Sequence, residues 1–253
     1  MNERSKVRLF VDHPLGPGQS VGLTETQAHY LFAVMRLETG NAVAVFNGRD
    51  GEWQALVTET GRRRGSLRCD LQSAPQVLPP DLWLLFAPLK KTRTDFIVEK
   101  AAELGVRRIL PVTTAFTGTD RINRDRLQAH AIEAAEQCGG VFVPEVAPLA
   151  PLSAVLADWN PDRRIMWCDE GLADRPAAAA DAATLTAALP QRRPAAVLTG
   201  PEGGFAPAER ERLAALPFVV PVRLGPRILR ADTAAVAALA VWQLACGDWT
   251  GGA

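Results

Sequence analysis

The sequence has few of the residues from which metal and disulfide sites are built. Its 253 residues include four cysteines and three histidines, widely spaced, with no C-x-x-C pair. This spacing gives no zinc signature, so we expect no bound metal and interpret the cysteines as reduced structural residues. The amino terminus lacks the apolar segment of a signal peptide, and no run is long enough to span a membrane. We therefore expect a cytoplasmic protein.

The sequence also lacks an excess of charge of either sign, since 28 lysines and arginines balance 28 aspartates and glutamates. A polycation that coats nucleic acid is thereby excluded, and binding to nucleic acid would need a local basic surface. No G-x-G-x-x-G follows an early strand, which argues against an ordinary Rossmann methyltransferase or dehydrogenase. No P-loop lysine is present either, so a nucleotide-phosphate site on a doubly wound fold is the least favoured reading.

The amino-terminal part shows short strands, one helix and strong turn signals. The turns are Asn47-Gly48 and Asp50-Gly51. Strands are predicted at residues 8–11, 42–46, 52–60 and 66–72, and a helix at 25–37. This pattern favours a small β-barrel. A proline-rich stretch then separates it from the rest, so we predict a first domain at residues 1–74, a linker at 75–81 and a second domain at 82–253.

Strands alternate with helices in the second domain. Strands are predicted at 82–87, 108–112, 164–168, 195–199 and 218–224, and helices at 94–104, 124–138, 207–216 and 233–246. Such alternation is typical of an α/β domain whose mostly parallel sheet is covered on both faces. The alanine-rich stretch 177–188 is predicted to be a surface helix or a loose connection.

Two glycine-containing loops follow the last two predicted strands. The first is Gly200-Pro-Glu-Gly-Gly-Phe205, and the second is Gly225-Pro-Arg-Ile-Leu-Arg230. Glycine lets a backbone approach a ligand closely, and ligands of parallel sheets bind at the carboxyl ends of the strands. The loops therefore predict a ligand site held largely by backbone. Asp232 or Thr233 is expected to cap the alanine-rich helix that follows.

These two loops, with Leu224-Gly-Pro-Arg-Ile-Leu-Arg-Ala-Asp-Thr233, closely resemble the RsmE family of 16S rRNA (uracil-N3)-methyltransferases in the SPOUT superfamily. The segment His29-Tyr-Leu-Phe-Ala-Val-Met-Arg36 is similar to the PUA-like amino-terminal domain of that family. The resemblance implies a trefoil-knotted carboxyl-terminal domain, S-adenosylmethionine as cofactor, a homodimer, and 16S rRNA, within the assembled 30S subunit, as substrate. Asp232 departs from the family's usual glutamate, and Gly140 stands where a basic residue is frequent.

The resemblance and the chemistry of the loops give a set of candidate site residues. An uracil N3 carries a proton that some group must accept, and the developing negative charge needs stabilisation. Arg230 is the candidate for stabilising charge, with a salt bridge to Asp232 as its structural alternative, and Glu202 or Asp232 is the candidate for accepting the proton. Candidate cofactor-binding residues are Trp167, Leu198, Thr199, Gly200, Pro201, Glu202, Gly203, Leu224, Gly225, Pro226, Arg227, Ile228 and Leu229.

Basic residues suggest where RNA would be held. The candidates for RNA phosphate contacts are Arg8, Arg36, Lys90, Lys91 and Arg93. Two other functions stay open at this stage: a related methyltransferase that acts on tRNA or on the ribose 2′-oxygen, and a non-catalytic RNA-binding or ribosome-assembly factor. Methylated-nucleoside analysis separates the first from the uracil enzyme, and cofactor binding would count against the second.

Overall fold

The computed structural model describes residue 5, residues 7–172 and residues 193–250. The chain divides into two compact units, one of Met1–Leu78 with Ala135–Val143 and one of Pro79–Ala134 with Pro144–Ala253. The alanine-rich stretch 177–188, predicted to be a surface helix or a loose connection, lies outside the described residues. None of the helices within the described ranges is long and apolar enough to cross a bilayer.

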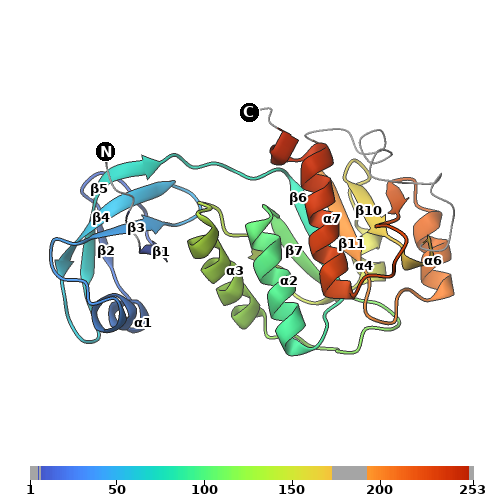
Figure 1. Ribbon diagram of the computed structural model, residues 1–253, viewed down its shortest axis with the longest axis horizontal. Coiled ribbons are helices and arrows are strands. Elements are labelled where there is room, and N and C mark those ends of the chain that lie inside the picture. Colours follow the sequence, from blue (N-terminus) through green and yellow to red (C-terminus); the bar gives the residue numbers. More distant parts are fainter. Residues whose placement is uncertain (1–4, 6, 173–192, 251–253) are drawn as a thin grey trace. The chain divides into compact units, whose positions relative to one another are not determined.

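The first unit is built on a five-stranded sheet (Figure 1). Its strand order is β1-β3-β4-β5-β2, in which β1 and β3 pair in parallel and the other neighbours in antiparallel fashion. Alternate residues of β4, such as Trp53, Ala55 and Val57, point into one buried core. The strands are β1 Arg8–Phe10, β2 Ser20–Gly22, β3 Ala42–Phe46, β4 Glu52–Glu59 and β5 Ser66–Ala74.

The helical segment of the first unit is shorter and less regular than predicted. It consists of helix α1, Glu25–Ala28, followed by a π-helical stretch at His29–Val34. The side chain of Thr24 accepts a hydrogen bond from the Gln27 backbone, and the Gln27 side chain accepts one from the Thr24 backbone. This capping box fixes where the helix begins.

The second unit contains a parallel sheet with the strand order β12-β10-β11-β6-β7-β8. A further short strand, β9, pairs with β7. Because β11 lies between β10 and β6, the ends of strands far apart in the chain meet at one edge. The strands are β6 Leu82–Phe86, β7 Arg108–Thr113, β8 Glu145–Val146, β9 Ala150–Pro151, β10 Arg164–Cys168, β11 Ala195–Thr199 and β12 Val219–Val222.

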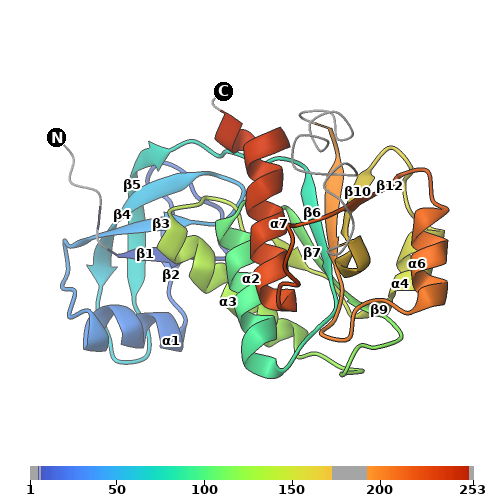
Figure 2. The ribbon, with the colours of Figure 1, turned by 45° about the vertical axis from the view of Figure 1, so that its right-hand side comes forward.

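Helices cover both faces of this sheet. Helices α2 and α7 lie side by side on one face, and α4 and α6 lie on the other (Figure 2). Under α4 and α6, the buried side chains of Leu85, Trp167 and Leu198 pack with Leu213 and Phe205. The helices are α2 Lys91–Glu103, α3 Arg124–Cys138, α4 Leu152–Ala157, α6 Pro207–Ala214 and α7 Ala231–Cys246, with single 3₁₀ turns at Glu170–Leu172 and Asp248–Thr250.

One predicted helix cap is wrong. Helix α7 begins at Ala231 with Arg230 as its N-cap residue, and no side chain makes a capping hydrogen bond there. Asp232 and Thr233 therefore lie inside the first turn. The Asp232 carboxylate accepts a hydrogen bond from the adjacent Thr233 backbone, which leaves its other oxygen for a partner outside the helix.

Candidate functional site

A pocket lies at the carboxyl edge of the parallel sheet, where β10, β11 and β12 end. It has a volume of about 610 Å³, counted to its solvent-facing mouth. Three loops and the first turns of α7 form its wall. The lining residues are Cys168, Asp169, Glu170, Thr199, Gly200, Pro201, Glu202, Gly204, Val222, Arg223, Leu224, Gly225, Arg227, Ile228, Leu229, Ala231 and Ala234.

Glycine is required in the loop after β11. Gly204 has a φ of +69°, and a side chain there would collide with the Glu170 carboxylate. A side chain at Gly200 would lie 2.7 Å from the ring of Phe205. Glu170 in turn accepts a hydrogen bond of 3.1 Å from the Phe205 backbone, so the loops after β10 and β11 hold each other.

The loop after β12 offers both apolar side chains and free backbone donors. Gly225 has a φ of +114°, and the side chain of Ile228 is 75% exposed. Within the described residues, the backbone N–H groups of Leu224, Gly225, Ile228 and Leu229 donate no hydrogen bond. Aliphatic side chains next to unpaired N–H groups suit a flat apolar ring with polar atoms on its edge. This donor set fits the adenine of the cofactor that the resemblance implies.

The structure brings most of the predicted cofactor residues to this pocket and leaves four outside its wall. Thr199, Gly200, Pro201, Glu202, Leu224, Gly225, Arg227, Ile228 and Leu229 line it, whereas Trp167, Leu198, Gly203 and Pro226 do not. Trp167 is buried, and its ring stands edge-on to Phe205 with the ring centroids 5.7 Å apart. Leu198 is fully buried in the same core. Both side chains support the pocket from behind.

Asp169 and Glu170 are pocket residues that sequence reasoning missed. They follow β10, which pairs with both β11 and β12, so their position at the pocket depends on the strand order. Arg210 on α6 pairs with Asp169 at 2.9 Å. The one available sequence signal was an acidic pair directly after a predicted buried strand.

Arg93 connects two of the predicted catalytic carboxylates. Its guanidinium pairs with Glu202 and lies 3.6 Å from the Asp232 carboxylate. Asp232 is 19% exposed, and Glu202 is 56% exposed. Arg230 is exposed and makes no ion pair within the described residues, so the alternative salt bridge to Asp232 is not formed. Arg230 does not line the pocket, although it directly follows the lining residue Leu229, whereas Glu202 and Asp232 are linked through Arg93.

Cys168 contributes no thiolate to the pocket. Burial raises the pKa of its thiol to about 12, so the group stays protonated at neutral pH. A protonated thiol is a poor nucleophile and a poor metal ligand. Within the described residues, no cluster of histidine, cysteine and acidic side chains could hold a metal ion.

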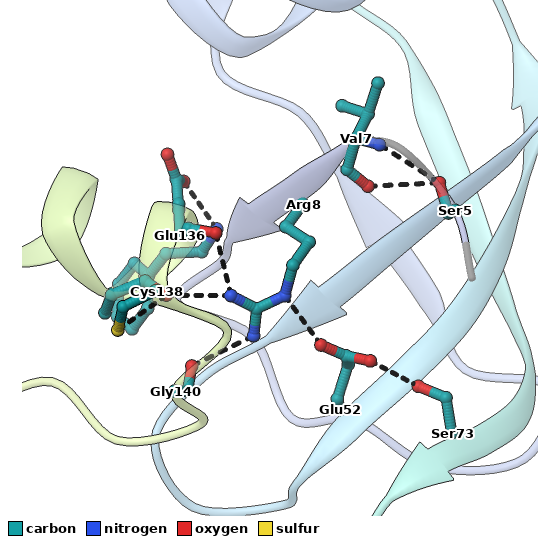
Figure 3. A network of polar contacts seen from close by, with 10 residues as sticks. Ser5, Val7, Arg8, Glu52, Ser73, Glu136, Cys138 and Gly140 are labelled. Atoms are coloured by element: carbon teal, nitrogen blue, oxygen red, sulfur yellow. Dashed lines mark hydrogen bonds and ion pairs between the residues drawn. The ribbon is translucent and has the colours of Figure 1, made fainter. Parts of the chain in front are cut away.

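The predicted RNA contacts lie in contrasting environments. Arg8 is 15% exposed and pairs with Glu52, and it donates hydrogen bonds of 2.7–2.9 Å to the carbonyls of Ala135, Glu136 and Gly140 (Figure 3). These partners leave its guanidinium little capacity for a phosphate, so the geometry supports a structural role. Arg36, with a φ of +56°, Lys90 and Lys91 are exposed.

Comparisons with known proteins agree with this architecture. Residues 76–243 match the family model described as an RNA methyltransferase domain, and residues 23–68 match that of an RNA methyltransferase PUA domain. A ribosomal RNA small subunit methyltransferase E from Synechocystis is 33% identical, over 87% of this chain and 72% of the relative. The corresponding protein of Rickettsia conorii is 27% identical, over 94% of this chain and 95% of the relative.

Solved structures show the same fold. A protein from Legionella pneumophila, solved in complex with the bound cofactor SAM, has a TM-score of 0.79 at 27% identity, over 97% of this chain and 100% of that one. A ribosomal RNA small subunit methyltransferase E from Neisseria gonorrhoeae has a TM-score of 0.81 at 24% identity, over 96% and 99% of the two chains. The predicted α/β class, with a parallel sheet and an amino-terminal PUA domain, is confirmed.

Proposed function

Because the chain belongs to the ribosomal RNA small subunit methyltransferase E family, we propose that it methylates N3 of one uridine in 16S rRNA with S-adenosylmethionine as methyl donor. The observation that carries the proposal is the pocket formed by the two glycine-containing loops, with Glu202 of the Arg93–Glu202–Asp232 cluster in its wall. Arg230 directly follows the second loop in the sequence. The bound cofactor supplies an activated methyl group. The protein supplies its position and the handling of the proton.

We further propose that residues 1–74 bind RNA and residues 82–253 carry the methyl transfer, with the assembled small subunit as substrate and the cytoplasm as place of action. The PUA match at residues 23–68 and the methyltransferase match at 76–243 support this division of labour. A base is modified at N3 only when its pairing edge is free, so the uridine has to be unpaired or extruded from its stack.

The chain's own residues perform three tasks in this proposal. Loop backbone after β11 and β12 holds the cofactor in line with the uracil, which removes most of the entropic part of the barrier. Arg230 stabilises the negative charge that develops on the uracil oxygens. Glu202 accepts the N3 proton as N3 forms its bond to the methyl carbon; its Oε1 atom faces Arg93, and its Oε2 atom has no hydrogen-bond partner within the described residues.

The proposal is tested by incubating the protein with radiolabelled S-adenosylmethionine and undermodified small ribosomal subunits, followed by nucleoside mapping. We expect label in 3-methyluridine at a single 16S position. Arg230→Ala should reduce turnover by about 100-fold or more while leaving cofactor affinity within about threefold. Arg193→Ala, an exposed residue just before β11 at the opposite edge of the sheet, is the matched control. Label in a ribose of the 16S rRNA would refute the uridine assignment.

We also propose that the protein is a homodimer, as the resemblance implies. Helix α7 and the 3₁₀ turn after it expose Leu244 at 62% and Trp249 at 49%, which supports an apolar contact surface there. The solution mass decides the matter: a monomer at micromolar concentration would contradict the proposal.

A further inference from the structure

A second groove at the same edge of the parallel sheet is lined by cations. It lies where β6 and β7 end, between the loop that leads into α2 and the loop that leads into α3. We propose that this groove binds a backbone phosphate of the substrate RNA through Lys91, Arg121 and Arg126. The inference rests on the proposed function for the identity of the RNA, and on the groove alone for the binding of phosphate.

The groove's lining is mainly polar and contains no carboxylate. Its volume is about 500 Å³, counted to the open side. The lining residues are Pro88, Leu89, Lys91, Thr94, Thr119, Arg121, Ile122, Asn123, Arg126 and Leu127. In a chain whose charges cancel, Lys91 and Arg121, which have no acidic partner within the described residues, give this groove a local positive charge, while the charge of Arg126 is balanced by Asp95. The flanking Asp120 and Asp125 are exposed and do not line the groove.

Two of the three cations are free to bind a ligand. Lys91 and Arg121 are exposed and make no ion pair within the described residues. Arg126 is different, because its guanidinium pairs with Asp95 of α2 and is thereby held in place. The groove therefore offers one cation that is held in place and two exposed cations that are available to an anion.

The start of α2 adds a second, independent sign of an anion site. Helix starts favour acidic residues because of the helix dipole, yet the first turn of α2 holds Lys91 and Arg93 and no acid. The N-cap residue, Lys90, makes no side-chain capping hydrogen bond. A phosphate would satisfy both the exposed N–H groups of this helix start and the surrounding cations. The cations in the first turn of α2 are unfavourable for folding, and binding of a phosphate would explain why they are there.

Sheet order places the groove beside the cofactor pocket. Strand β6 pairs with β11, so the loops after β6 and β7 continue the edge that the loops after β10, β11 and β12 begin. An RNA strand whose target base enters the pocket would therefore carry a neighbouring phosphate along this edge. A phosphodiester of single-stranded RNA is the ligand that this placement and charge require.

The test uses polyuridylic acid, whose binding does not depend on methylation. The affinities of the whole protein and of Lys91→Gln, Arg121→Gln and the double variant are measured by fluorescence anisotropy between 50 and 300 mM salt. Loss of one phosphate contact should weaken binding by about fivefold at 0.1 M salt and reduce the slope of log K against log salt by about 0.7. Arg193→Gln is the control of equal charge at the opposite edge. Both substituted side chains are exposed, so the thermal midpoints should stay close to that of the unmodified protein.

The outcomes separate this inference from the proposed function. Weaker binding and a smaller slope for both variants, with normal cofactor affinity, would support the groove. Variants that bind like Arg193→Gln, or an unmodified protein that binds no polyuridylic acid at 50 mM salt, would overturn it. Methylation of small subunits by the unmodified protein is assayed in parallel. If the subunits are labelled but the variants bind polyuridylic acid like the control, the groove alone is refuted. If the variants bind polyuridylic acid more weakly but the unmodified protein labels no uridine in the subunits, the uridine assignment alone is refuted.

Discussion

Arg93 joins three segments of the second unit through one side chain. It stands in the first turn of α2, and its partners are Glu202 in the loop after β11 and Asp232 in the first turn of α7. A guanidinium between two carboxylates fixes their separation and relieves their repulsion. We therefore propose that Arg93 positions the proposed proton acceptor; the sequence had suggested an RNA contact for this residue.

Arg93→Met should disturb catalysis more than folding. We expect kcat to fall by about 10- to 100-fold because the two carboxylates lose their common partner. Unfolding free energy should change by less than about 1 kcal/mol, since the pair is partly exposed and screened. Lys100→Met, which removes an exposed ion pair with Glu103 on the same helix, is the control. A kcat for Arg93→Met equal to that of the control would exclude the positioning role.

Asp50 makes the stability of the first unit depend on pH in the acidic range. The Leu15 backbone N–H holds the pKa of this carboxyl below its ordinary value, and the Asn47 side chain lowers it further. A pKa that is depressed in the folded state contributes stability above the unfolded value, and this contribution is lost as the pH falls through the folded value. The window of loss therefore lies below about pH 4.

Asp50→Asn should lower the free energy of unfolding by about 1 kcal/mol at pH 7, because charged hydrogen bonds become neutral ones. The difference from the unmodified protein should shrink as the pH falls below about 4. Urea unfolding at pH 7, 5 and 3.5 measures it, and Asp12→Asn, whose side chain is 88% exposed, is the control. A difference that stays constant over this range would contradict the assignment.

At the scale of one element, the start of α2 combines a cost in stability with a use in binding. Lys91→Glu places an acidic residue where the helix dipole favours it, which should raise the free energy of unfolding by about 0.3–1 kcal/mol. For a chain of this size, we expect the thermal midpoint to rise by about 1–3 °C while RNA affinity falls. Differential scanning calorimetry at low salt, with Lys91→Gln for comparison, measures the first effect. A lower midpoint for Lys91→Glu would show that Lys91 stabilises the helix instead.

The bounds of elements with a clear apolar pattern were predicted correctly. Helix α3 and strands β3, β10 and β11 have the predicted bounds, because charged or turn-forming residues flank a clear apolar period. Strands β2, β8 and β9 were missed, since two or three residues carry no measurable period. The predicted helix at 25–37 became α1 and a π-helix, a change of hydrogen bonding that residue spacing does not encode.

At the scale of the whole molecule, the sequence located the two main loops of the site but not the residues that the strand order brings to them. Gly200–Gly204 and Leu224–Leu229 could be found because each loop follows its own strand and contains glycine. Asp169 and Glu170 reach the pocket only because β10 lies between β11 and β12. Arg121 and Arg126 reach the groove only because β7 is the neighbour of β6. Such neighbours are decided by tertiary pairing, which one sequence does not display.

The contacts of Arg8 fix an order of events during synthesis. Arg8 emerges from the ribosome early, but the carbonyls that it binds belong to residues 135–140. At about 5–20 residues per second, the interval between the synthesis of residue 78 and that of residue 140 lasts roughly 3–12 s. During that time, the Arg8 guanidinium can pair with Glu52 and stack on Phe46, but it lacks the three carbonyls that it binds in the complete unit. A nascent chain stalled before residue 135 should therefore be more sensitive to protease in its first 78 residues than one stalled well beyond Gly140.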